Sequence, residues 1–296
     1  MTGSTQGTRF REAVAQERPL QIVGAINAYA ALLAQRVGFR ALYLSGAGVA
    51  NASFGMADLG LTSLTEVAEE VRRITAVCSL PLLVDIDTGW GSALGIERTI
   101  AQLTRAGAAA LHLEDQVAEK RCGHRPGKAL VPAREMCDRV SAAAQGRIDP
   151  SLVIMARTDA IAVEGLDQAI ERSLGYIAAG ADMIFAEAMR SPQEMQRFSS
   201  AVPVPVLANL TEFGQTPLMS VDELRACGIA MALYPLSAFR AMNLAAQQVY
   251  AAIRRDGTQQ SMVAQMQTRQ ELYEVLDYLQ VERRIDQLLQ RGTSNE

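Results

Sequence analysis

Two carboxylates stand two residues apart in the stretch "LLVDIDTGWG", where Asp85 and Asp87 end an apolar run. On a β-strand, side chains two positions apart point to the same face, so both carboxylates would share one side. Like charges held that close are costly unless a cation neutralises them, and oxygen ligands suit Mg²⁺ or Mn²⁺. His112 and Glu114 repeat the spacing in "LHLED" and could extend the metal shell. A helix cap combined with a turn would explain the same aspartates without a metal.

A thiol stands among cations in "KRCGHRPGK", where Cys122 has Lys120, His124 and Arg125 close by. Positive neighbours favour the thiolate, so we expect them to lower the pKa of Cys122. The stretch belongs to a long loop, residues 116–131, and loops of this length often act as lids over a site. The same cations could hold substrate carboxylates. An exposed cysteine with solvated basic neighbours is the alternative.

Other apolar runs end in groups that could bind an anionic substrate. In "MARTDA", Arg157 could clamp a carboxylate through its planar fork, or could form a structural ion pair with Asp159. In "YLSGAGVANASFG" the dinucleotide-binding fingerprint fails for want of a third glycine, but the backbone N–H groups of residues 45–47 could cradle a carboxylate. Glu187 ends a further run, where a lone glutamate is more often solvated than catalytic.

The elements that must position these residues repeat one design, a helix that ends in Gly followed by an apolar strand. Gly allows the positive φ found at such helix ends, and the four glycines are Gly38, Gly107, Gly180 and Gly228. Four further strands are predicted at residues 22–27, 81–87, 152–158 and 205–210. Eight apolar strands that alternate with helices in about 235 residues favour a (β/α)₈ barrel.

Polar residues fall at or near the C-terminal ends of seven of these strands. They are Asn27, Ser45, Asp85 with Asp87, Glu114, Arg157 with Asp159, Glu187 and Asn209. In a barrel these ends converge on one mouth, where such folds carry their chemistry. Residues 237–296 follow the eighth strand as helices, and residues 266–290 are predicted to form one of them. We predict a single domain over residues 1–296, with these helices packed on the barrel or on a neighbouring subunit.

Composition limits the possible classes of function. The chain has 296 residues, of which 49% are hydrophobic, and its formal net charge of −4 gives no electrostatic support for a nucleic-acid partner. No apolar run approaches the roughly 20 residues of a membrane span. The four cysteines include no CxxC pair, which argues against a zinc knuckle or a disulfide framework. We expect a cytoplasmic protein that acts on a small molecule.

The stretches "KRCGHRPGK", "LLVDIDTGWG", "LHLEDQ", "IMARTDA" and "LANLTEFG" resemble the isocitrate lyase and phosphoenolpyruvate mutase superfamily. "MALYPLSAFRAMN" and "MQTRQELYE" are similar to its branch that cleaves 2-methylisocitrate. The resemblance implies a (β/α)₈ barrel and a homotetramer whose C-terminal helices exchange between subunits. It also implies Mg²⁺-dependent cleavage of this tricarboxylate to pyruvate and succinate, a step of propionate breakdown.

The resemblance further assigns roles to residues. Asp85 would bind Mg²⁺ with Asp87, Glu114 and Asp58 around it, and Cys122 would deliver a proton to carbon after the bond breaks. The base that takes the hydroxyl proton would be Asp58 or a metal-bound hydroxide. The implied catalytic residues are Cys122, His124, Asp58, Lys120 and Arg125. The implied substrate-binding residues are Ser45, Gly46, Ala47, Cys122, Gly123, Arg157, Glu187, Asn209, Leu210, Thr211, Leu233, Pro235, Arg240 and Arg269.

Three positions and one motif bear on specificity. Leu233 and Pro235 stand where isocitrate lyases carry other residues and would leave room for the extra methyl group. Ala47 departs from the glycine that is frequent in the family, and its methyl group could crowd the substrate. Isocitrate lyase, oxaloacetate decarboxylase, a mutase and a catalytically silent metabolite-binding barrel are the alternatives. The intact "CGH" argues against a decarboxylase or mutase, which need no such proton donor, and the intact cysteine, carboxylates and arginines argue against a silent barrel.

Overall fold

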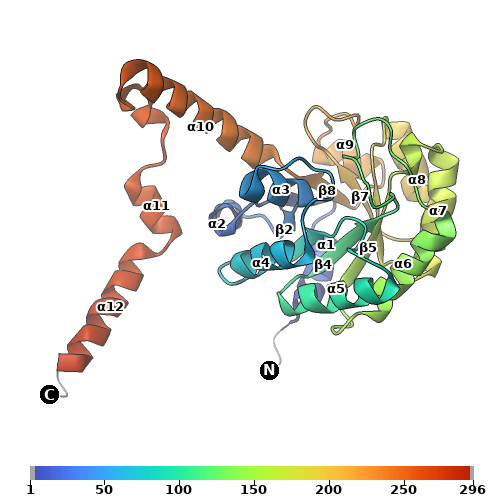
Figure 1. The fold of residues 1–296 in the computed structure, drawn as a ribbon, viewed down its shortest axis with the longest axis horizontal. Helices are drawn as coiled ribbons and strands as arrows, with labels where there is room; N and C mark the ends of the chain where they lie inside the picture. The colour runs from blue at the N-terminus through green and yellow to red at the C-terminus, as the bar shows by residue number, and fades with distance from the viewer. Residues whose placement is uncertain (1–3, 294–296) are drawn as a thin grey trace. The chain divides into compact units, whose positions relative to one another are not determined.

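Eight short parallel strands close into a barrel in the computed structural model, which describes residues 4–293 (Figure 1). Each strand pairs with the next along the chain, and the last pairs with the first. The strands are β1 (Leu20–Gly24), β2 (Ala41–Leu44), β3 (Leu82–Asp85), β4 (Ala110–Glu114), β5 (Val153–Thr158), β6 (Met183–Ala186), β7 (Val206–Asn209) and β8 (Met231–Tyr234). Strands covered on both faces are rich in Val, Ile and Leu, as these are. The predicted (β/α)₈ barrel is confirmed.

Helices surround the barrel, and Figure 1 shows α4 to α8 arranged around its outside. The helices of this part of the chain are α1 (Gln6–Gln16), α2 (Ala28–Val37), α3 (Gly46–Phe54), α4 (Leu64–Thr75), α5 (Ala93–Arg105), α6 (Ala133–Gln145), η1 (Ala160–Ala162), α7 (Leu166–Ala178), α8 (Pro192–Ala201) and α9 (Val221–Ala226). The four joint glycines, Gly38, Gly107, Gly180 and Gly228, have φ values of 101°, 102°, 115° and 74°. A residue with a Cβ would be strained there, so the predicted helix–glycine–strand joints are confirmed.

The first strand lies earlier in the chain than residues 22–27, where we predicted it. Asn27 does not end the strand but caps α2, and its side-chain oxygen accepts a hydrogen bond from the backbone N–H of Ala30 at 2.9 Å. Asn is among the strongest N-cap residues. A polar residue after an apolar run therefore marked the start of the next helix.

The barrel interior is filled beneath its mouth. Inward side chains form one apolar cluster that includes Tyr43, Phe185 and Leu233. Helix α1 contributes Phe10, which is fully buried, to the same cluster at the N-terminal ends of the strands. A second, larger cluster lies between the strands and the outer helices. The interior is thus a packed core beneath the C-terminal ends of the strands.

The chain divides into two compact units, Met1–Phe239 and the C-terminal Arg240–Glu296. The elements of the second unit are α10 (Ser237–Asp256), which starts in the first unit, η2 (Gln260–Gln265), α11 (Arg269–Val275) and α12 (Tyr278–Thr293). The single helix predicted over residues 266–290 is wrong. The chain breaks at Asp277, whose φ is 50°, a conformation that Asp tolerates better than most residues. The rings of Tyr273 and Tyr278 stack across this break, with centroids 4.2 Å apart.

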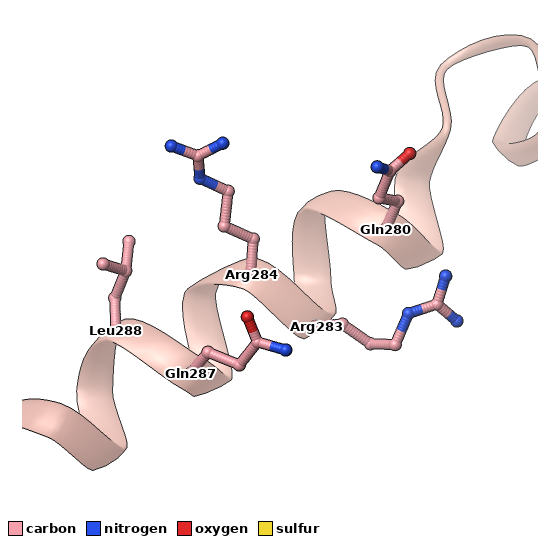
Figure 2. Close-up of a pocket in the computed structure, with 5 residues that line it drawn as sticks. All are labelled: Gln280, Arg283, Arg284, Gln287 and Leu288. Atoms are coloured by element: carbon pink, nitrogen blue, oxygen red, sulfur yellow. The ribbon is translucent and has the colours of Figure 1, made fainter.

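Helix α12 carries a hollow of about 430 Å³ (Figure 2). Its lining consists of Gln280, Arg283, Arg284, Gln287 and Leu288. This lining has no thiol and no carboxylate, so the hollow lacks the groups of the predicted chemistry. No helix within residues 4–293 combines the length and the apolar character needed to cross a bilayer.

Candidate active site

The polar residues predicted at the strand ends gather at the mouth of the barrel. Parallel pairing sets Asp85 level with His112, and Glu114 level with Arg157. Glu187 follows β6 and contacts Asn209, the last residue of β7, with 3.3 Å between the amide nitrogen and either carboxylate oxygen. These six side chains are all buried. The mouth is therefore a dense cluster of charges that compensate one another.

Asp85 is held from several directions. It accepts hydrogen bonds from the backbone N–H of Gly46 at 3.1 Å and from the Tyr43 hydroxyl at 3.3 Å. Burial alone would raise the pKa of Asp85, but protonated His112, Lys120 and Arg157 lower it. Burial also lowers the pKa of His112 to about 4, so at neutral pH the lysine and arginine keep Asp85 ionised. The N–H of Gly46 is thereby engaged, so the predicted backbone cradle over residues 45–47 lacks its central donor.

Asp87 does not lie on the strand with Asp85, so our alternation argument is wrong. Strand β3 ends at Asp85, and Asp87 has a left-handed conformation with φ of 48°. Both carboxylates nevertheless approach Gly46, where an added Cβ would lie 3.1 Å from an oxygen of Asp85 and 3.3 Å from one of Asp87. Burial and the charge of Asp85 raise the pKa of Asp87 to about 6. The Lys120 ammonium offsets this effect, since it lies 2.5 Å from Asp87 and 2.9 Å from Asp58.

Arg157 forms the centre of a second charge cluster. Its Nε lies 3.0 Å from Asp159 and 3.3 Å from Glu114, and its Nη2 lies 3.2 Å from Glu187. Burial opposes ionisation of Glu187, but Arg157, His124 and Lys128 together outweigh it and hold the pKa of Glu187 below its usual range. The predicted ion pair with Asp159 is present. A buried guanidinium fixed in this way is also preorganised to meet a carboxylate that enters the mouth.

The acidic side chains fit a divalent cation that keeps much of its water. Burial raises the pKa of Glu114 well above its usual value, and its Oε1 is buried without a hydrogen-bond partner. A nearby cation would remove that cost. Within residues 4–293, no three His, Cys, Asp or Glu side chains come together as a complete set of metal ligands. Mg²⁺ commonly uses one or two carboxylates with water and substrate, so Asp85 with Asp87 and Glu114 nearby suits Mg²⁺ better than a metal that needs a closed protein cage.

The loop that carries Cys122 lies over this cluster, but the pKa that we expected for the thiol is wrong. We expected the neighbouring cations to lower the pKa of Cys122, but burial of the thiol raises it. The cations of the stretch are engaged elsewhere, Lys120 by Asp58 and Asp87, and Lys128 by Asp159 at 2.8 Å. The thiol is therefore protonated at neutral pH, as a proton donor must be.

His124 is held in one tautomer over Glu187. Its Nδ1 accepts a hydrogen bond from the backbone N–H of Gln215 at 3.0 Å, so the proton resides on Nε2. Nε2 lies 3.0 Å from Glu187 and can donate to it. Glu187 itself is 1% exposed, so it is not the solvated glutamate that its isolation in the sequence suggested. His124 thus links the loop to the ends of β6 and β7.

Several predicted residues are not brought to the mouth by their side chains. Leu210 packs in the outer apolar cluster, and its N–H donates to the carbonyl oxygen of Leu233 at 2.8 Å. Arg125 is exposed, and its N–H closes a turn with the Cys122 carbonyl at 2.9 Å. Arg240 and Arg269 lie in the second compact unit, and their roles in substrate binding stay predictions.

The remaining predicted residues lie near the strand ends. Ser45 caps α3, and Ala47 lies in the first turn of that helix. Thr211 is buried just after β7. Leu233 faces the barrel interior, and the carbonyl oxygen of Pro235 lies so close to Gly24 that a Cβ there would approach it to 1.7 Å.

Sequence reasoning assigned no role to two further groups at the mouth. The Tyr43 hydroxyl lies 2.9 Å from Nε2 of His112 as well as bonding Asp85. Lys128 was one of the cations in the quoted stretch, but its carboxylate partner, Asp159, lies 31 positions further along the chain. Tyr43 could have been found, because it precedes Ser45 by two residues on a strand and must share its face.

This barrel and its acidic, arginine-centred mouth match a known family. The phosphoenolpyruvate phosphomutase family model matches residues 10–254. The chain belongs to this family, as its motifs predicted.

Two relatives are similar over almost the whole chain, and both are 2-methylisocitrate lyases. The one from Escherichia coli strain K12 is 57% identical, with 99% of each chain covered. The one from Salmonella typhimurium strain LT2 is 56% identical, covering 99% of this chain and 100% of the relative.

Solved structures of the superfamily share the fold. A 2,3-dimethylmalate lyase of the phosphoenolpyruvate mutase and isocitrate lyase superfamily is 32% identical, with a TM-score of 0.89 over 96% of this chain and 95% of that one. A phosphonopyruvate hydrolase solved with oxalate and Mg²⁺ is 30% identical, with a TM-score of 0.82 over 94% and 97%.

Proposed function

We propose that this protein is a carbon–carbon lyase that cleaves 2-methylisocitrate to pyruvate and succinate. The observation that carries the proposal is the position of Cys122, on a loop whose Gly123 lies against the arginine and carboxylate cluster of the barrel mouth. Cleavage leaves a carbanion that must receive a proton, and a half-buried thiol whose pKa is raised is a suitable donor. Relatives of this name, 56–57% identical along the whole chain, support the assignment.

The residues divide the work as follows. Asp58, whose carboxylate lies 2.9 Å from the Lys120 ammonium, would take the proton of the substrate hydroxyl, unless a metal-bound hydroxide does so. Arg157 binds a substrate carboxylate. The Nε2–H of His124 and the amide of Asn209, which contact Glu187 in this structure, would turn to the negative charge that develops when the bond breaks. Cys122 then delivers its proton to carbon. Ser45 and the start of α3 would contact the half of the substrate that becomes pyruvate.

We propose Mg²⁺, or Mn²⁺ in its place, as the cofactor. Asp85 would hold it, with Asp87 and Glu114 around it, partly through water. When bound, it would supply positive charge that lowers the cost of removing the hydroxyl proton. The described cluster supports this role because Asp85 is kept ionised and one oxygen of Glu114 has no hydrogen-bond partner.

We further propose a homotetramer in which the C-terminal helices pack on neighbouring subunits. Helix α12 exposes five large apolar side chains, each more than half accessible: Leu279, Val281, Ile285, Leu288 and Leu289. An apolar face of this kind is buried in most stable proteins, and a second copy of the chain could cover it. All four cysteines are free, in keeping with the reducing cytoplasm that we propose as its compartment. Light scattering of the purified chain would give the mass, and a monomer would contradict the tetramer.

The experiment that tests the function is product identification. The protein is incubated with Mg²⁺ and either 2-methylisocitrate or isocitrate, and the keto acid is identified by mass spectrometry. We expect pyruvate from 2-methylisocitrate, little glyoxylate from isocitrate, and no product after chelation. One methyl group in an apolar pocket is worth about 1–3 kcal/mol, so a preference of about 10- to 200-fold is expected. A preference for isocitrate would overturn the substrate assignment.

A further inference from the structure

Lys128 is almost completely buried, although it belongs to a surface loop. Its side chain is 2% exposed. The ammonium donates to the carbonyl oxygen of Gly123 at 2.5 Å and to Oδ1 of Asp159 at 2.8 Å. It therefore joins the peptide next to Cys122 to the end of strand β5. Burying an ammonium is costly, and only a well-placed partner such as Asp159 makes this position stable.

The backbone at Gly123, whose carbonyl oxygen Lys128 binds, has almost no free space on the side that faces the barrel mouth. A Cβ added to Gly123 would lie 2.4 Å from Nη2 of Arg157 and 2.6 Å from Cγ of Glu187. The backbone at Gly123 is thus pressed against the charge cluster of the mouth. The ammonium of Lys128 binds its carbonyl oxygen and so restrains the plane of this peptide.

The anchor itself is rigid. Asp159 is fully buried, and its backbone N–H donates to Oδ1 of Asp115 at 2.9 Å. The other oxygen of Asp115 accepts hydrogen bonds from Thr158 at 2.7 Å and from the Tyr176 hydroxyl at 2.9 Å. The chain of contacts runs from helix α7 through Asp115 to Asp159. Asp159 therefore stays in place when the loop moves, and the Lys128 side chain must reach it for the contact to form.

From these contacts we infer that Lys128 is the positioning residue of Cys122. It holds the Gly123 peptide against the fixed Asp159, and this sets the thiol over the mouth when the loop is closed. Lys128 contacts no reacting group itself. The inference rests on the proposed role of Cys122 in the lyase reaction, but the position of the thiol can be measured without turnover.

The test compares Lys128→Met with Arg147→Met in the full-length chain. Arg147 pairs with Asp182, which precedes β6 at the opposite end of the barrel, so its loss removes a cation from a carboxylate without touching the loop. The first measurement is the rate at which iodoacetamide alkylates Cys122, located by peptide mass spectrometry. The second is the separation of kcat from KM for 2-methylisocitrate.

We expect Lys128→Met to alkylate at Cys122 about tenfold faster than the wild type, because the loop opens more often. We expect its kcat to fall about 10²-fold with little change in KM, since a displacement near 1 Å has an effect of that size. Arg147→Met should resemble the wild type in both measurements. Wild-type alkylation in Lys128→Met, or an equal change in both variants, would overturn the inference.

A second variant covers the case in which Lys128→Met does not fold. Lys128→Gln keeps a donor for the Gly123 carbonyl but loses the charge that binds Asp159. Its alkylation rate should lie between those of the wild type and a free loop, and a rate equal to that of the wild type would also overturn the inference. If neither substrate is cleaved by the wild type, the proposed function fails, while the alkylation rates still decide the role of Lys128.

Discussion

Gly123 offers the sharpest test of how closely the loop must approach the barrel. In Gly123→Ala the new Cβ would lie 2.4 Å from Nη2 of Arg157, whereas ordinary contact begins at 3.4 Å. Either the loop or the arginine must therefore move by the difference of these two distances, about 1 Å. Gly123 has an ordinary φ, so the effect is one of space and not of backbone strain.

A displacement of that size separates the thiol from the carbon that it must protonate. Misplacement by about 1 Å costs roughly 10²-fold in rate, which corresponds to about 2.7 kcal/mol of barrier. We expect kcat of Gly123→Ala to fall by this factor, measured as pyruvate release coupled to lactate dehydrogenase.

The matched control for this variant is Gly95→Ala. A Cβ at Gly95, in helix α5, would lie 3.5 Å from the nearest neighbouring atom, the carbonyl oxygen of Trp90. We expect this variant to keep wild-type kcat. Thermal midpoints of both variants would exclude unfolding under the assay conditions. Wild-type turnover in folded Gly123→Ala would refute the reasoning, because the loop would then work without its close approach to Arg157.

Three further predictions concern the same loop. Cys122→Ser should lose about 10²- to 10⁴-fold in turnover but keep Mg²⁺-dependent binding of succinate by calorimetry, and wild-type turnover would remove the thiol from the reaction. Because burial raises the pKa of Cys122 above its ordinary value of 9.0, the thiol stays protonated at neutral pH, so its alkylation rate should still be rising at pH 9. A plateau near pH 7 would contradict this. Proteolysis within residues 116–131 should slow when Mg²⁺ and both products are present, and an unchanged rate would argue against a lid.

Local patterns were sufficient to predict the barrel from the sequence. Each joint glycine sits between an amphipathic helix and an apolar strand, so three neighbouring signals agree at Gly107 and at Gly180. The predicted residues at the mouth follow from the same assignment of eight strands, because parallel strands in a barrel have their C-terminal ends on one side. Asn27 was misplaced because a strand end and a helix cap favour the same residue types. The break at Asp277 was missed because the apolar pattern continues through it.

The electrostatics of the mouth could not be predicted in this way. The expected pKa of Cys122 depended on whether the neighbouring lysines were free, and their partners Asp58, Asp87 and Asp159 come from distant segments. The Asp87 carboxylate likewise pairs with Lys120, which lies 33 positions further along the chain. Contacts between segments decide such properties, and residue spacing does not encode them.

The filled core beneath the mouth has a consequence for the order of events in each catalytic cycle. Helix α1 and the inward apolar side chains fill the barrel beneath the mouth. The two products must therefore leave by the opening through which the substrate entered, one after the other. The same movement of the loop then admits the tricarboxylate and releases the second product, so the frequency of loop opening sets an upper limit on kcat however fast the bond is broken.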